Sequence, residues 1–139
     1  VLARFPEVIA SETFQAAGRV QAWVVGPGMG TDDDAARLLA SVLATDVPVV
    51  VDADGLTLLA QRPELVAART APTLLTPHAG EFARFTTLGD DRIAATRALA
   101  ARLGVTVLLK GHTTVISDPG VFTIFSWAWY MNIVPSRIL

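Results

Sequence analysis

The sequence predicts an α/β protein with a mostly parallel sheet, and two observations support this. Short apolar runs recur along the chain, separated by segments with helical spacing; the runs span residues 22–26, 47–52, 73–76 and 105–110. They are apolar on both faces instead of alternating with polar residues, which is typical of parallel strands covered by helices above and below. Strands that alternate with helices form right-handed βαβ units. We therefore expect a three-layer αβα sandwich.

Four helical segments are expected between these strands. Residues 31–44 open with capping residues and continue with the dense apolar spacing of a packed helix. Residues 56–61 carry a shorter pattern, with Pro63 either closing it or opening another turn, and residues 80–85 are helical again. Residues 90–104 have an acidic start, an alanine-rich middle and a terminal glycine, which together indicate a well-defined helix.

A fifth strand is expected at residues 113–117, and it should run antiparallel to its predecessor. The step from Lys110 to Thr113 is too short to hold a crossover helix. Beyond Pro119 the composition changes sharply, so we expect a domain over residues 1–120 and an atypical aromatic tail over 121–139.

The tail admits three interpretations. Its apolar part is shorter than the roughly 20 residues of a membrane-spanning helix, and Thr123, Ser126 and Asn132 interrupt it, so no membrane span is expected. A buried strand followed by a terminal segment is the simpler interpretation. The third is that the tail does not belong to the fold, because its composition differs so much from what precedes it.

Composition limits the classes of function. The chain has 139 residues, 52% of them hydrophobic, enough for one well-buried domain. A net charge of −2 gives no positive surface, so no nucleic-acid partner is expected. The absence of cysteine excludes disulfides and thiolate chemistry and fits a reducing compartment, so we expect a cytoplasmic protein. No signal peptide is visible and no Met begins the sequence, which could be a piece of a longer chain.

Glycines and ionisable residues gather where each of the first four strands ends. The four segments are Gly26–Gly30, Asp52–Gly55, Thr76–Glu81 and Lys110–Thr114. The carboxyl ends of parallel strands lie on one edge of a sheet, and ligands of open α/β sheets bind outside that edge. Ordinary turns and caps explain each segment alone, but they explain the fourfold coincidence less well. We therefore expect a small-molecule site along this edge.

The glycine loop at residues 26–30 lets backbone approach a ligand closely. It is not a phosphate-binding P-loop, and Thr31 stands where a dinucleotide-binding motif has its third glycine. Asp32, Asp33 and Asp34 would favour a helix N-terminus but repel a bare phosphate there. A tight turn before a capped helix explains the loop about as well as a binding site does.

Two acidic residues and the chain's single lysine follow the second and fourth strands. Asp52 and Asp54 could hold Mg²⁺ or accept from a hydroxyl, although Asp54 is a natural N-cap and we favour that role for it. Lys110 could contact a nucleotide phosphate, or it could be a solvated surface lysine. His112 is expected to be a polar loop residue, not a catalyst.

His78 lies at the junction between a strand and a helix. Pro77 fixes one φ angle before it, Gly80 frees another after it, and Glu81 falls in the first turn of the helix. From this segment alone, a turn histidine bonded to backbone and a ligand contact are equally good interpretations.

Taken in order, the segments "GPGMG", "VVVDADGL", "LLTPHAGEFARF" and "VLLKGHTTVI" resemble the ADP/ATP-dependent NAD(P)H-hydrate dehydratases, members of the ribokinase-like superfamily. The match runs from about Pro6 to about Asp118. The resemblance implies a ribokinase-like fold and a repair lyase. Such an enzyme dehydrates the S epimer of hydrated NADH or NADPH, driven by hydrolysis of ADP or ATP with Mg²⁺.

The resemblance also implies roles for the residues at the strand ends. The hydrated nicotinamide would be bound by Gly26, Gly28, Gly30, Asp52 and His78. The adenine nucleotide would lie against Lys110, Gly111, His112, Thr113 and Thr114. No residue is assigned as a metal ligand.

The sequence departs from the family in three places. The glycine- and alanine-rich portion that the family has before "PEV" is absent, so the match is expected to be incomplete at both ends. After "DAD" the family has Ala-Leu-Asn, whereas this chain has Gly55, Leu56 and Thr57. The family's downstream "GxGD" loop, whose Asp is the expected catalytic residue, has no counterpart, and no Asp or Glu follows Gly120. The catalytic residue is therefore unassigned, and weakened activity is expected if these residues are the entire product.

Three alternatives remain open. A sugar or vitamin kinase of the same superfamily shares the architecture and needs the same missing loop. A non-enzymatic interpretation is a nucleotide-binding remnant, or an oligomer partner whose aromatic tail docks on another chain, and a homo-oligomer is one form of it. A dinucleotide oxidoreductase is the weaker competitor, because Pro27 lies inside the glycine loop.

Overall fold

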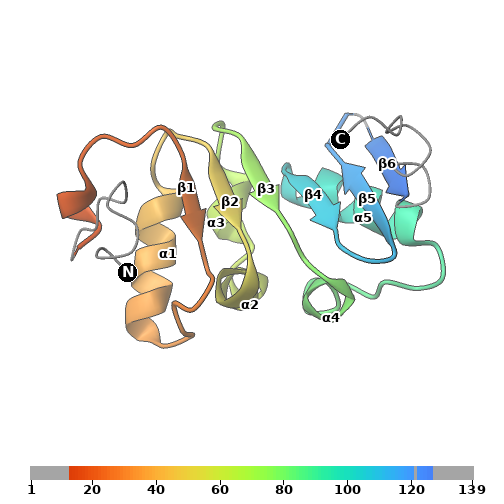
Figure 1. Ribbon diagram of the computed structural model, residues 1–139, viewed down its shortest axis with the longest axis horizontal. Coiled ribbons are helices and arrows are strands. Elements are labelled where there is room, and N and C mark those ends of the chain that lie inside the picture. The colour runs from red at the N-terminus through yellow and green to blue at the C-terminus, as the bar shows by residue number, and fades with distance from the viewer. Residues whose placement is uncertain (1–12, 121, 127–139) are drawn as a thin grey trace, which may run out of the picture.

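The computed structural model describes residues 13–120 and 122–126. Its centre is one six-stranded sheet whose strands lie side by side in chain order (Figure 1). The strands are β1 (Trp23–Val25), β2 (Val49–Val51), β3 (Thr73–Leu75), β4 (Thr106–Leu109), β5 (Thr113–Ser117) and β6 (Phe122–Ser126). Strands β1 to β4 are parallel, and β5 and β6 each pair antiparallel with the preceding strand. The predicted order and direction of the first five strands are confirmed.

Five α-helices and one 3₁₀ turn accompany the sheet. They are η1 (Gln15–Ala17), α1 (Asp33–Leu43), α2 (Ala53–Gln61), α3 (Glu64–Ala67), α4 (Ala79–Phe82) and α5 (Arg92–Leu103). Asp32 caps α1, since its Oδ1 accepts from the backbone N–H of Ala35 at 2.8 Å. Asp91 caps α5 in the same way, through the N–H of Ala94 at 2.9 Å. The predicted helices are confirmed, and α3 is an additional turn after Pro63.

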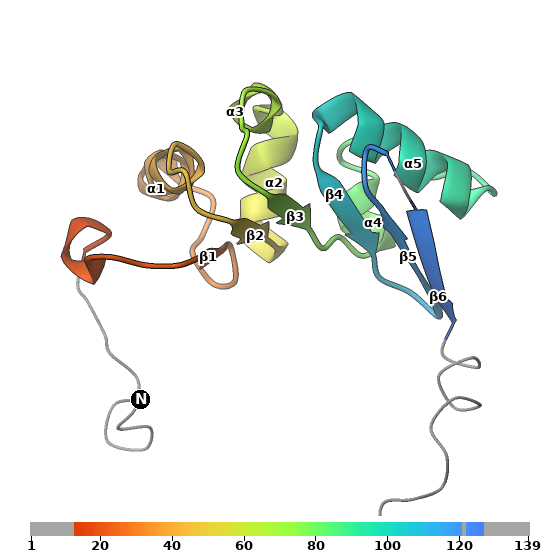
Figure 2. The ribbon, with the colours of Figure 1, turned by 90° about the horizontal axis from the view of Figure 1, so that it is seen from above.

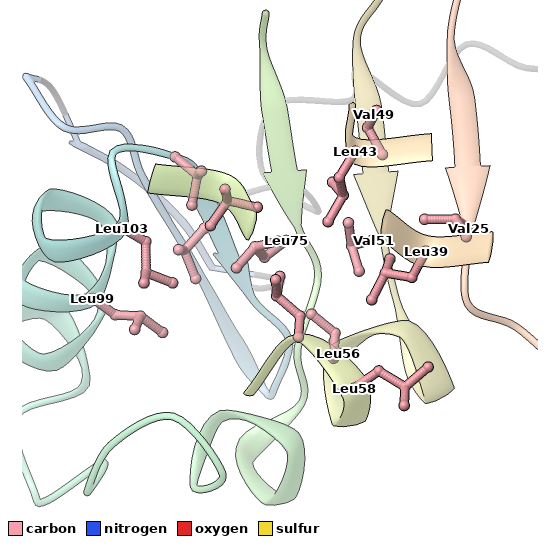
Figure 3. Packing of buried hydrophobic residues seen from close by; sticks show 14 of the residues in the cluster. Val25, Leu39, Leu43, Val49, Val51, Leu56, Leu58, Leu75, Leu99 and Leu103 are labelled. Carbon is pink, nitrogen blue, oxygen red and sulfur yellow. The ribbon is translucent and has the colours of Figure 1, made fainter. Parts of the chain in front are cut away.

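The described helices all lie on one side of the sheet (Figure 2). The cause is the strand order: right-handed crossovers between neighbouring parallel strands that follow one another in sequence always return over the same face. The buried strand residues accordingly share that face, and Val25, Val51 and Leu75 point towards the helices (Figure 3). Together with Leu39 and Leu56 they belong to one continuous hydrophobic core.

The opposite face of the sheet is also apolar. Val24, Val50 and Leu74 are in register across β1, β2 and β3, and they alternate with the core residues. Val24 is 69% exposed. Within residues 13–120 and 122–126, no helix covers this face, so the second helical layer of the expected sandwich is not supplied by the described part of the chain.

The predicted tail is described only in part. β6 supplies the strand that the simpler interpretation of the tail requires, and residues 127–139 lie outside the described residues. None of the helices in the described part of the chain is long and apolar enough to cross a membrane.

Candidate functional site

A bidentate ion pair spans the carboxyl edge of the sheet. Lys110 follows β4 and Asp52 follows β2, so the lysine side chain reaches across the end of β3. Lys110 Nζ donates to Asp52 Oδ1 at 2.9 Å and to Oδ2 at 3.2 Å. The lysine side chain is 41% exposed and the aspartate side chain 29%. The only lysine of the chain is therefore held by a carboxylate at the predicted site, and it is not a free surface lysine.

The environment of Asp52 favours its charged form. Partial burial, the largest single influence, raises the pKa of its carboxyl, but the opposing influences outweigh burial. The hydrogen bond from Lys110, the backbone N–H of Ala53, the lysine charge and the Thr76 hydroxyl together lower the pKa from its ordinary value of 3.8. Asp52 is therefore a carboxylate at neutral pH, able to accept hydrogen bonds but not to donate them.

Asp52 also caps α2, and the prediction that Asp54 would do so is wrong. The helix begins at Ala53, and Asp52 has an extended backbone with its Oδ1 2.9 Å from the N–H of Ala53. Ala53 has a φ of 48°, in the left-handed region that costs an L-residue roughly 1–2 kcal/mol. Because the helix starts earlier than its apolar pattern, Asp54 falls in the first turn and its side chain is free for another partner.

That partner is the glycine loop. Asp54 Oδ2 accepts from the backbone N–H of Gly30 at 3.0 Å, which ties the end of the loop after β1 to the first turn of α2. The two aspartates therefore act in opposite directions along the edge: Asp52 reaches Lys110 after β4, and Asp54 reaches Gly30 after β1. Sequence reasoning missed this bond, because no local signal indicates which neighbouring loop a first-turn carboxylate will meet.

At the start of the glycine loop, Gly26 lies unusually close to the backbone of Asp52. Gly26 has a φ of 126°, and a Cβ at this position would lie 1.8 Å from the backbone oxygen of Asp52. Gly55 lies opposite, and a Cβ added to it would be 3.1 Å from the Cα of Gly26. Gly28 and Gly30 differ, since a Cβ at either would meet no atom within 4 Å. The first glycine is required by packing, and the other two expose loop backbone at the edge.

His78 is the N-cap of α4, so it does make the backbone bonds of a turn histidine. Its Nδ1 accepts from the N–H groups of Gly80 at 3.0 Å and Glu81 at 3.2 Å. Glu81 Oε2 in turn accepts from the N–H of His78 at 2.9 Å, which completes a capping box. Because Nδ1 is an acceptor, Nε2 carries the ring proton. The side chain is 58% exposed, so the cap leaves room for a ligand contact.

His78 and Lys110 are neighbours at the ends of β3 and β4. The N–H of Lys110 donates to the carbonyl of Pro77 at 2.8 Å, and a parallel bridge joins His78 to Lys110. The predicted substrate-binding and nucleotide-binding segments are therefore adjacent. The structure brings all four predicted loops to one edge, as the parallel sheet requires.

Arg92 is a second cation at this edge, and sequence reasoning did not select it. Its Nη2 donates to the carbonyl of Lys110 at 3.3 Å. A Cβ added to Gly111 would lie only 2.7 Å from the same Nη2. Arg92 is the first residue of α5, and the packing of α5 against β4 and β5 carries it to this place. The sequence contains no spacing signal for such a contact.

The predicted nucleotide-binding residues form the turn into β5. Gly111 and His112 are exposed in the turn, and Thr113 and Thr114 open the strand half-buried. An open hollow of about 470 Å³ lies beside them, and it is lined by Asp90, Asp91, Arg92, Ile93, Thr113 and Val115. His112 is a polar loop residue, as expected.

The described residues do not fit a magnesium site of their own. No group of three or more His, Cys, Asp or Glu side chains in residues 13–120 and 122–126 could hold a metal ion. Asp52 and Asp54 are engaged with Lys110 and Gly30, and so they do not form the joint site that their spacing allowed. Mg²⁺ in nucleotide-dependent enzymes is held largely by substrate phosphates, which needs no such cluster.

The arrangement is suited to binding a polar ligand. One edge combines a paired lysine and carboxylate, an exposed imidazole whose Nε2 lies 3.5 Å from Glu81 Oε2, and the backbone of a glycine loop. Within the described residues, a threonine hydroxyl is hydrogen-bonded to a carboxylate at two places, Thr106 to Asp118 at 3.0 Å and Thr76 to Asp52, and neither includes the histidine base of a catalytic triad. The described site can therefore orient and neutralise a ligand, whereas the reacting group is not evident among these residues.

Comparison with known proteins gives a consistent result. The family model described as NAD(P)H-hydrate dehydratase matches residues 1–126. The bifunctional NAD(P)H-hydrate repair enzyme Nnr of Mycobacterium tuberculosis is 67% identical over 122 residues, covering 86% of this chain and 26% of that protein. The ADP-dependent (S)-NAD(P)H-hydrate dehydratase of Neisseria meningitidis is 42% identical over 130 residues, covering 86% of this chain and 44% of that protein.

Solved structures agree. The ADP/ATP-dependent NAD(P)H-hydrate dehydratase of Bacillus subtilis, co-crystallised with ATP/Mg²⁺, is 31% identical with a TM-score of 0.63, over 75% of this chain and 38% of that one. A ribokinase-like superfamily protein of Enterococcus faecalis is 28% identical with a TM-score of 0.64. The ribokinase-like, mostly parallel fold is thereby confirmed. The chain spans less than half the length of each of these relatives.

Proposed function

Because the chain belongs to the NAD(P)H-hydrate dehydratase family, we propose that it forms the ligand-binding part of an ADP-dependent (S)-NAD(P)H-hydrate dehydratase. The substrate is hydrated NADH or NADPH, and ADP or ATP with Mg²⁺ is the co-substrate. The observation that carries the proposal is the convergence of the four family segments on one edge of the sheet, joined by the Asp52–Lys110 pair.

The proposed roles divide along this edge. Gly26, Gly28 and Gly30 present loop backbone to the hydrated nicotinamide, with Asp52 and His78 beside them. The support for His78 is its geometry: the cap engages Nδ1, Nε2 lies 3.5 Å from Glu81 Oε2, and the side chain is still 58% exposed at the edge. The support for Asp52 is that its carboxylate stays charged and can accept from a hydroxyl of the hydrated ring.

The nucleotide lies against the turn after β4. Lys110, Gly111, His112, Thr113 and Thr114 are its proposed contacts, and the hollow beside Thr113 supplies space for it. Hydrolysis of ADP or ATP supplies the driving force for loss of water from the hydrated ring. No step is assigned to a metal, because the described residues do not fit a metal site of their own.

The group that does the chemistry is expected in a "GxGD" loop, which this sequence does not contain. We therefore propose that these 139 residues bind both ligands but turn over slowly or not at all by themselves. We also propose a cytoplasmic location, which the absence of cysteine supports.

The test is a turnover assay with hydrated NADH, ADP and Mg²⁺, run on the 139-residue chain and on a full-length relative such as the Neisseria meningitidis dehydratase. The expected result is formation of NADH by the relative and much less by the 139-residue chain. Equal activity of the two would refute the role given to the missing loop. Transfer of phosphate from ATP to a sugar or vitamin alcohol, without NADH formation, would favour the kinase alternative instead.

A further inference from the structure

Asp52 and Lys110 contact each other although the proposed function places them against different ligands. The following inference rests on that proposed function. We propose that the two side chains exchange partners when the nucleotide binds. A phosphate of the nucleotide takes Lys110 from Asp52, and the released carboxylate becomes an acceptor for a hydroxyl of the second ligand.

The first support is that the ion pair is accessible. Lys110 is 41% exposed and Asp52 29%, so water and ligands reach the pair. Partly exposed ion pairs change an equilibrium by only about 1.4- to 5-fold, because water screens the charges and ordering the side chains is costly. A phosphate oxygen is a comparable or stronger partner for an ammonium group than a carboxylate is. The pair is therefore readily exchanged.

The second support is that the Asp52 side chain has a further hydrogen bond that holds it in place, whereas the Lys110 side chain has none among the described residues. Asp52 Oδ1 remains held by the N–H of Ala53 at 2.9 Å, so the carboxylate keeps its position when the lysine leaves. Lys110 is fixed through its backbone, by the bonds to Pro77 and from Arg92, whereas Nζ has no described partner other than Asp52. Its four-carbon stem can turn about that anchor.

The third support is the charge balance at the edge. Lys110 is the only lysine, and its charge is fully matched by Asp52 in the structure described here. A phosphate within reach of Nζ also comes close to the Asp52 carboxylate, and like charges at such distances repel. Separation of the pair relieves this repulsion and leaves the Asp52 carboxylate without its lysine partner.

Thermodynamic linkage makes the consequence reciprocal. If nucleotide binding frees Asp52 for the hydrated nicotinamide, then the hydrated nicotinamide must favour nucleotide binding by the same factor. The pair thus couples two ligands that lie at neighbouring strand ends. It does so without moving the backbone of the sheet.

The test is direct binding of ADP, measured by calorimetry, to the 139-residue chain and its variants. The Asp52→Asn variant removes the competing charge but keeps an oxygen that caps α2, and we expect it to bind ADP about two- to fivefold more tightly. Lys110→Met should weaken binding about tenfold or more. Asp46→Asn is the matched control, since it removes one negative charge at the amino edge, before β2, and should change ADP affinity by less than about twofold.

A second measurement does not depend on the fold of a variant. Protein labelled with ¹⁵N and ¹³C in lysine has one lysine side chain, so its resonances report on Lys110 alone. Addition of ADP should shift these resonances, and inorganic phosphate should shift them in the same direction at higher concentration. The change in chemical shift with the concentration of each ligand gives the dissociation constants of ADP and of inorganic phosphate at Lys110.

The outcomes separate the two proposals. Unchanged or weaker ADP binding by folded Asp52→Asn, while the unmodified chain binds ADP, would overturn the exchange and leave the proposed function standing. ADP binding without any change in the lysine resonances would have the same meaning. No ADP binding by the unmodified chain would refute the nucleotide-binding role itself, and the exchange with it.

Discussion

The Cα of Gly26 and the backbone oxygen of Asp52 leave no room for a methyl group between them, since a Cβ would lie 1.8 Å from that oxygen. Gly26→Ala should therefore force apart the ends of β1 and β2 and lower the free energy of unfolding by about 3 kcal/mol or more. Gly28→Ala is the control: its φ of 70° is unfavourable for alanine but its Cβ would meet nothing, so about 1–2 kcal/mol is expected. Urea unfolding measures both, and equal losses would contradict the close approach.

The hydrogen bond from Gly30 to Asp54 should hold the glycine loop in one conformation. Asp54→Ala removes the acceptor for the N–H of Gly30 and should cost about 0.5–1.5 kcal/mol of stability. The Gly30 amide should also exchange its hydrogen faster with solvent. Asp54→Asn keeps an acceptor oxygen and should restore most of the protection. Amide exchange followed by NMR checks this, and unchanged protection of Gly30 in Asp54→Ala would count against the bond.

The two interpretations of His78 can be separated by substitution. His78→Asn keeps an N-cap acceptor and should leave stability within about 0.5 kcal/mol, whereas His78→Ala should lose about 1 kcal/mol. If Nε2 also contacts the hydrated nicotinamide, both variants should bind that ligand more weakly. A purely structural histidine would give normal binding in His78→Asn, which thermal unfolding and calorimetry on the same sample would reveal.

The stability that Asp52 contributes should depend on pH with a definite sign. Its pKa is lower in the folded chain than the ordinary 3.8, so its contribution is complete above that value and is lost as the pH falls through the folded pKa. The difference in unfolding free energy between the unmodified chain and Asp52→Asn, roughly 0.2–1 kcal/mol for a partly exposed pair, should be constant near neutral pH and shrink below about 3.8. A difference that grows on acidification would have the wrong sign for this explanation.

The two neighbouring valines of β1 should differ strongly in the stability that the same substitution costs. Val25→Thr places a hydroxyl in the core, where Val25 is 6% exposed, and should cost about 1–3 kcal/mol. Val24→Thr changes a side chain that is 69% exposed and should alter stability by less than about 0.5 kcal/mol. Urea unfolding of both variants measures the two losses, and equal losses would contradict the assignment of the two faces.

Much of the fold could be predicted because it follows from local chemistry. The apolar runs place β1 to β4, and the short step from Lys110 to Thr113 dictates an antiparallel β5. Capping residues were expected at the start of residues 31–44 and an acidic start at residues 90–104, and Asp32 and Asp91 cap these two helices. The convergence of the four strand-end segments was also predictable, since parallel strands bring their carboxyl ends to one edge.

The contacts within the site could not be predicted, since they depend on which side chains meet across the sheet. Lys110 and Asp52 are 58 positions apart in sequence and are separated by the whole of β3. The cap of α2 was assigned to the wrong aspartate because the helix begins before its apolar pattern does. Arg92 reaches the edge only through the packing of α5, which composition does not encode.

The strand order has a consequence for how the sheet can be assembled. Each strand pairs with the one that precedes it in sequence, so no pairing has to wait for a distant segment. The entropic cost of closing a connection grows only slowly with its length, so the crossovers between neighbouring strands cost little more than short loops do. During synthesis, β1 and β2 can join around α1 while β4 is still inside the ribosome. The carboxyl edge is then completed last by Lys110, whose side chain closes over an Asp52 that is already in place.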